Sequence, residues 1–141
     1  MSKTILLTVD LNRSAENAAA LQAALDLLGP NGTLHVVSVL PDFGMSQVSG
    51  FFKQGFEKDA LDDFGQRLAD WVREAVPEAT DVHPHVLHGT IYDEILRAAD
   101  KLAVDVIVIG SHRPELKDYL LGPNAARVVR HAKQSVYVVR T

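Results

Sequence analysis

The chain has 141 residues, of which 47% are hydrophobic, so it fits one domain with a single buried core. It contains no cysteine, which excludes disulfides, thiolate catalysis and cysteine-based zinc or iron–sulfur sites, and this fits a reducing cytosol. The formal net charge of -4 argues against nucleic acid as a partner, since its phosphate backbone is normally met by a clustered basic surface.

The first elements in the chain are a predicted strand and a predicted helix. Thr4–Val9 is a continuous apolar run, which is typical of a strand buried on both faces of a parallel sheet. A helical pattern follows over Ser14–Leu28, where Ser14 is expected to be the N-cap and the turn residues 29–32 end the helix. Its apolar stripe is predicted to consist of Ala18, Leu21, Ala24, Leu25 and Leu28.

The next part of the chain predicts a β-branched strand, Thr33–Val39, and a longer helix, Glu57–Ala75. The stripe expected to pack this helix on a sheet is Leu61, Phe64, Leu68, Trp71, Val72 and Ala75. Between the two elements, Pro41–Gly55 contains glycines and several aromatic residues. Two interpretations are open for this segment: a flexible surface loop, or a lid or partner surface formed by the aromatics from Phe43 to Phe52.

The second half of the chain continues the alternation of strand and helix. Pro84 lies within an alternating run and places that strand at the edge of the sheet, because proline cannot donate a ladder hydrogen bond. The predicted elements are Asp81–His88, Ile91–Leu102, Asp105–Ile109, Pro123–Ala132 and Ser135–Val139, of which the second and fourth are helices.

The order of these elements predicts the fold class. Strict β-α-β alternation requires right-handed crossovers and a parallel sheet covered by helices on both faces. We therefore predict one doubly wound α/β domain over residues 1–141. The arrangement that we expect has flavodoxin-like layering and five parallel strands in the order 3-2-1-4-5. A ligand crevice in such a sheet opens where the strand order reverses, at the carboxyl ends of the first and fourth strands.

Polar and glycine residues follow those two strands. Asp10 comes directly after the first strand, and two interpretations stay open for it: a ligand for ribose or a divalent cation, or a turn residue before the helix. Gly110 follows the fourth strand, and Gly122 precedes a helix whose N-terminal N–H groups could bind phosphate. The sequence contains neither a P-loop, nor a dinucleotide fingerprint after the first strand, nor a nucleophile elbow at Gly110.

Several segments resemble the universal stress protein family. The first is Ile5–Asp10 with the following residues 12–14, and the element order agrees over the whole chain. The C-terminal third carries the most specific likeness, over residues 107–114, 119–132 and 136–140. The loop that reads Ser-His-Arg-Pro, 111–114, is similar to that of one subgroup of the family, whose members are also regarded as nucleotide binders.

The resemblance implies a fold like that of the adenine nucleotide alpha hydrolases and a site for ATP or AMP, with or without Mg²⁺. Asp10 would contact a metal only through nucleotide-bound Mg²⁺, and no metal site of the protein's own is expected. The resemblance also implies a homodimer formed through the last strand, Val136–Val139, with a tetramer as the alternative. The residues implied to contact nucleotide are Thr8, Val9, Asp10, Val39, Gly110, Ser111, His112, Arg113, Gly122, Asn124 and Ala125.

The phosphate loop departs from the family pattern at two positions, Arg113 and Pro123, and has one residue fewer than the family between Arg113 and Gly122. Arg113 stands where ATP-binding members have a second glycine, and its guanidinium could either crowd the phosphates or pair with them. Pro123 replaces a hydroxyl residue and removes one N–H, which should weaken phosphate binding by about 1 kcal/mol for each hydrogen bond lost. The side-chain amide of Asn124 could replace part of that contact.

The function expected from these observations is that of a universal stress protein that acts as a nucleotide-dependent switch in a stress response. No general base, nucleophile or carboxylate pair can be assigned, so we expect no enzyme activity beyond slow, incidental ATP hydrolysis or autophosphorylation. The alternative is a nucleotide-free interaction module in which Arg113 fills the phosphate pocket and the Phe43–Phe52 loop contacts an unknown protein.

The remaining expectations concern location and the histidines. The longest apolar runs are too short for a signal segment or a membrane span, so a cytoplasmic protein without membrane contact is expected. His83, His85 and His88 lie close together, but only His83 and His85 share a face of an extended strand, which argues against a metal site.

Overall fold

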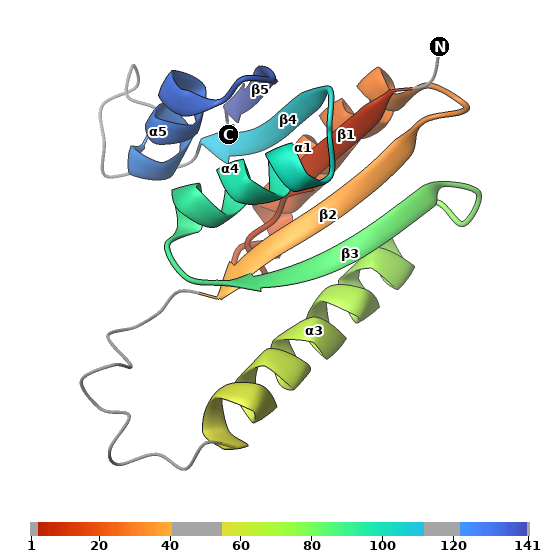
Figure 1. The fold of residues 1–141 in the computed structure, drawn as a ribbon. Coiled ribbons are helices and arrows are strands. Elements are labelled where there is room, and N and C mark those ends of the chain that lie inside the picture. The colour runs from red at the N-terminus through yellow and green to blue at the C-terminus, as the bar shows by residue number, and fades with distance from the viewer. Residues whose placement is uncertain (1–2, 41–54, 112–121, 141) are drawn as a thin grey trace.

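The computed structural model describes residues 3–40, 55–111 and 122–140 (Figure 1). Every strand and helix predicted from the sequence is present, with ends that differ by a few residues. In chain order the elements are β1 (Thr4–Thr8), α1 (Ser14–Leu28), β2 (Thr33–Leu40), α3 (Gly55–Ala75), β3 (Asp81–His88), α4 (Ile91–Lys101), β4 (Val106–Ser111), α5 (Pro123–His131) and β5 (Ser135–Arg140). The predicted loop from Phe43 to Phe52 lies outside the described residues.

The five strands form one parallel sheet in the order β3-β2-β1-β4-β5, which confirms the predicted fold class and strand order. Pro84 pairs in register with Val36 and lies in β3, at the edge of the sheet, as predicted. The chain runs outward from β1 to β3, then returns across the sheet to β4 beside β1. This return creates the reversal of strand order at which a ligand crevice is expected.

Both faces of the sheet are covered, and β1 shows why its sequence is continuously apolar. Ile5 and Leu7 point to the face covered by α1 and α3, whereas Leu6 points to the face covered by α4 and α5. All three side chains are fully buried. Burial of one such side chain contributes about 1.5–3 kcal/mol, so a polar residue at any of these positions would be costly.

The N-terminus of α1 differs from the prediction. Ser14 is the first helical residue, the N-cap position belongs to Arg13, and no side chain caps the helix there. Arg13 instead donates its backbone N–H to the carbonyl of Asp10 at 3.0 Å, which makes a tight turn between β1 and α1. The helix start is therefore set by this turn rather than by a serine cap.

The buried faces of two helices are also slightly rotated from the predicted stripes. In α1, Ala18 is exposed, and Asn17 and Ala20 are buried in its place. In the last turn of the α3 pattern, Ala75 is exposed and Val76 is buried. Alanine is a weak guide to the buried face, because it fits a helix equally well on either side. No helix in the described ranges is long and apolar enough to cross a bilayer.

Candidate functional site

A pocket of about 620 Å³ lies at the carboxyl ends of β1, β2 and β4, between the sheet and the N-termini of α1, α4 and α5. Its volume is in the range of ordinary small-molecule sites. Nine of the residues that the resemblance implied for nucleotide contact line this one pocket, and His112 and Arg113 lie outside the described residues. The nine are Thr8, Val9, Asp10, Val39, Gly110, Ser111, Gly122, Asn124 and Ala125.

One wall of the pocket is apolar. It is formed by Val39 at the end of β2, Ile109 in β4, and Ile91 and Ile95 in α4. Ile95 and Ile109 are almost fully buried and belong to the core between the sheet and α4. Aliphatic walls of this kind suit the flat, weakly polar face of a base or another ring.

A second wall is made by the end of β4 and the start of α5. Gly110 belongs to β4, where it pairs with Val139, and not to the loop after it. A Cβ at Gly110 would meet no atom of the described residues within 4 Å, and Gly110 lines the pocket. Gly122 has a φ of 83°, a left-handed conformation that favours glycine, and Pro123 is the first residue of α5.

The start of α5 is suited to an anion. Pro123 has no N–H, but the N–H groups of Asn124 and Ala125, in the first turn, have no carbonyl partner within the helix. The first turn contains no acidic residue that would occupy the positive end of the helix dipole. Because both residues line the pocket, an anionic group there can reach two backbone donors and the Asn124 side chain.

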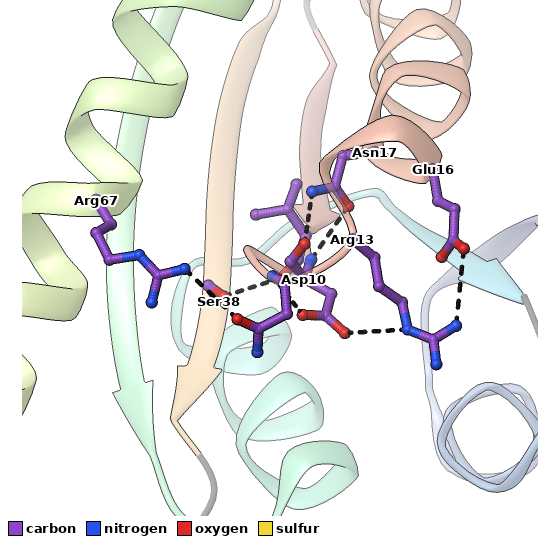
Figure 2. Close-up of polar contacts among 8 residues, drawn as sticks. Asp10, Arg13, Glu16, Asn17, Ser38 and Arg67 are labelled. Atoms are coloured by element: carbon purple, nitrogen blue, oxygen red, sulfur yellow. Dashed lines mark hydrogen bonds and ion pairs between the residues drawn. The ribbon is translucent and has the colours of Figure 1, made fainter.

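Asp10 takes the turn role that was one of its two predicted interpretations. Its Oδ1 accepts a hydrogen bond from the backbone N–H of Asn12 at 2.9 Å, and its Oδ2 lies 3.9 Å from Nε of Arg13 (Figure 2). Arg13 also lies 3.7 Å from Glu16, which leaves its guanidinium between two carboxylates. The Asp10 side chain is 57% exposed and lines the pocket, so its carboxylate remains accessible to a ligand there.

Two buried polar side chains hold the chain at the end of β1. Asn17 accepts the backbone N–H of Asp10 at 3.1 Å and donates its amide to the Asp10 carbonyl at 2.7 Å. Ser38 donates its hydroxyl to the carbonyl of Val9 at 2.9 Å (Figure 2). Both are nearly inaccessible, with 5% and 2% of their surface exposed. Together they fix the backbone that presents Asp10 to the pocket.

Sequence reasoning missed Asn17, Ser38 and Arg67, which all line the pocket. Arg67 reaches from α3, and its Nη2 donates to Oδ1 of Asn12 at 3.5 Å (Figure 2). A signal existed for Asn17, which lies one helical turn before Ala20 and Leu21 and is thus a polar residue on the apolar face. No comparable pattern marks Arg67, because its approach depends on how α3 packs across the sheet.

The model of the "Universal stress protein family" matches residues 1–140 of the chain. The chain belongs to this family. Universal stress protein G of Escherichia coli O157:H7 is 33% identical over 142 residues, a match that covers 99% of this universal stress protein and 100% of the relative. The protein of the same name from Salmonella typhimurium is 32% identical over the same length.

Solved structures share the fold of this universal stress protein. The hypothetical protein MJ0577 has a TM-score of 0.82 at 22% identity, with 100% of this chain and 97% of that chain covered. A universal stress protein solved in complex with cAMP has a TM-score of 0.68 at 22% identity, covering 98% of this chain and 97% of the other. Universal stress protein UspA from Lactobacillus plantarum also has a TM-score of 0.68 at 22% identity, covering 99% and 98%.

A histidine cluster lies away from the pocket, on the face of the sheet that α4 covers. His83 and His85 share this face, as predicted, and the structure adds His35 of the neighbouring strand, whose ring is 5.3 Å from that of His83 and 5.1 Å from that of His85. Nδ1 of His35 and Nε2 of His85 are hydrogen bonded at 2.9 Å. Desolvation and the neighbouring imidazoles lower the pKa of His35 and of His85 below 6.5.

These lowered pKa values predict that acid destabilises the fold. Below pH 6.5 the unfolded chain binds protons that the folded His35 and His85 resist, so the free energy of unfolding should fall as pH decreases through that range. Urea unfolding at several pH values between 7.5 and 5 measures this slope. His35→Asn, which keeps a polar atom near the Nδ1 position, should flatten it, whereas the exposed control His131→Gln should not. Equal slopes in all three proteins would contradict the assignment.

Proposed function

We propose that this universal stress protein binds an adenine nucleotide in the pocket at the carboxyl ends of β1, β2 and β4. The observation that carries the proposal is the pairing of an apolar wall with an anion-binding wall in one cavity of about 620 Å³. A nucleotide has the same division, because its base is flat and weakly polar and its phosphates are anionic. The universal stress protein that was solved with cAMP has the same fold and supports this proposal.

Each part of the nucleotide has a matching set of residues. The base would lie against Val39 and Ile91, and the exposed carboxylate of Asp10 would accept from a ribose hydroxyl. The phosphates would meet the backbone at Gly110 and the N-terminus of α5 at Asn124. ATP or AMP fits this division. Among the described lining residues, Asp10 and Glu16 carry the carboxylates that could contact Mg²⁺ bound to the phosphates.

The proposed action is that of a switch and not of a catalyst. Among the described pocket residues, the only carboxylates are Asp10 and Glu16, and Arg13 lies between them at 3.9 and 3.7 Å. Both carboxylates thus face the Arg13 guanidinium, whereas general-base catalysis needs a carboxylate positioned against the proton that it removes. Nucleotide occupancy would instead alter either a dimer formed through β5 or the contact with a partner protein. The strand β5 suits a dimer because it lies at the edge of the sheet and exposes Tyr137.

Calorimetric titration of nucleotide-stripped protein with ATP, AMP and ADP, with and without Mg²⁺, tests the proposal. Mass spectrometry of the unstripped protein identifies any nucleotide that is carried through purification, and light scattering shows whether the mass is twice the 15.4 kDa of one chain. Micromolar binding at one site per chain is the expected result. Turnover of about 1 s⁻¹ or faster would contradict the switch.

Absence of binding in a folded protein would favour a nucleotide-free interaction module with Arg113 in the phosphate pocket. Two variants distinguish the possibilities at this position, which lies outside the described residues. Tighter binding by Arg113→Gly would identify the side chain as an obstruction, whereas loss of binding in Arg113→Ala would identify it as a phosphate ligand.

A further inference from the structure

The pairing of β2 with β3 aligns three histidines on one face of the sheet. His35 and His83 are register partners on adjacent strands, and His85 follows His83 on the same face of β3. The backbone of two paired strands thus holds three imidazoles on one rigid surface. Nδ1 of His35 and Nε2 of His85 lie 2.9 Å apart and share one proton, so the two nitrogens point toward each other.

A second layer of contacts orients His83. Its Nε2 lies 2.8 Å from Oδ1 of Asp81, and the other oxygen of Asp81 accepts the hydroxyl of Thr33 at 3.0 Å. A carboxylate at Nε2 favours the tautomer with its proton there, which leaves Nδ1 of His83 as a bare acceptor. Carboxylates that accept from the far nitrogen of a histidine are the usual second layer of protein zinc sites.

The distances are near those of a zinc complex. Zinc binds imidazole nitrogen at about 2.0–2.1 Å, so two nitrogens on one tetrahedral ion lie roughly 3.3 Å apart, and their rings lie roughly 5 Å apart. The rings of His35 and His85 are 5.1 Å apart, and their nitrogens need only open slightly from 2.9 Å. Among the described residues, no group of three His, Asp or Glu side chains is arranged to hold a metal as it stands.

We propose that Nδ1 of His35 and Nε2 of His85 chelate a zinc-type transition-metal ion, while the proton that they share moves to the far nitrogen of the ring that carried it. His83 turns to supply its Nδ1 as a third nitrogen. The remaining coordination position would be taken by water, since His83 is exposed. Imidazole ligands suit Zn²⁺, Ni²⁺ and Cu²⁺ and exclude Mg²⁺ and Ca²⁺, which prefer oxygen. The charge of Lys101 near His85 opposes the metal, and that of Asp81 favours it.

The test is titration of untagged, chelator-treated protein with Zn²⁺ by calorimetry and with Co²⁺ by visible absorption, at pH 7.5. The expected result is one ion per chain, a cobalt spectrum of tetrahedral intensity, and a rise in the thermal unfolding midpoint with Zn²⁺. His85→Gln and His35→Asn should each weaken binding by more than about tenfold, and Asp81→Asn by about tenfold, through its hold on His83.

Matched histidine controls separate this site from adventitious binding. His131→Gln removes an exposed histidine at the end of α5 and should leave zinc affinity unchanged. Circular dichroism shows whether each variant is folded. The proposal is overturned if the folded wild-type protein shows no saturable binding, or if the variants of the cluster bind as the wild type does. ATP titrations of the same variants should be unchanged, because the cluster does not line the pocket.

Discussion

Replacement of Gly110 by valine is expected to weaken adenine-nucleotide binding by at least about thirtyfold, or roughly 2 kcal/mol, and to leave the fold intact. Gly110 lies near the end of β4, opposite Val139, and a Cβ there would meet no atom of the described part of the chain within 4 Å. Its φ is not among the positive values found at other glycines, so an L-residue fits the backbone. A β-branched side chain also suits a strand, and its methyl groups would take up space in the pocket.

Calorimetry with ATP measures the loss of affinity, and urea unfolding measures the stability of the same sample. Gly65→Ala is the matched glycine control, since it lies in α3, outside the pocket lining, and its Cβ would have ordinary contact with Val86 at 3.7 Å. That variant should bind ATP like the wild type and gain up to about 1 kcal/mol of stability from helix propensity. Undiminished ATP affinity in Gly110→Val would place the nucleotide elsewhere.

The fold could be predicted from the sequence because its strongest signals are local. The run from Ile5 to Leu7 alternates between two helical layers, so each residue is buried and the sequence shows no polar face. The edge position of β3 could be predicted from Pro84, because proline has no N–H to donate to a neighbouring strand. These signals depend on the strand alone, and the alternation with helices then requires a parallel sheet with right-handed crossovers, although it does not fix the order of the strands.

The polar framework of the pocket could be predicted only in part. Asp10 and Gly110 are found from their positions after apolar strands, since the carboxyl ends of parallel strands share one edge of the sheet. Ser38 and Arg67 act across elements, through Val9 and Asn12, and no spacing along the chain records those contacts. His35 was missed for the same reason, because it is separated from His85 by fifty positions and joined to it only by strand register.

Replacement of Asn17 by alanine is expected to lower the free energy of unfolding by about 2–3 kcal/mol. Asn17 is 5% exposed and makes two hydrogen bonds to the backbone of Asp10, at 3.1 and 2.7 Å. The variant would leave the backbone N–H of Asp10 without its partner, would remove one of the two hydrogen bonds to the Asp10 carbonyl, and would open a small cavity under the turn. Urea unfolding measures the change, and the exposed Asn12→Ala in the same turn should alter stability by less than about 0.5 kcal/mol.

A second variant separates the hydrogen bonds from the volume of the side chain. Leucine nearly matches asparagine in size, so Asn17→Leu would retain stability if packing alone mattered, and it should be as destabilising as alanine if the two hydrogen bonds dominate. The same turn presents Asp10 and Asn12 to the pocket, so both variants should also weaken ATP binding. A stable Asn17→Leu protein with full ATP affinity would show that the turn holds its shape without this side chain, and that Ser38 and the backbone hydrogen bond from Arg13 to Asp10 are sufficient.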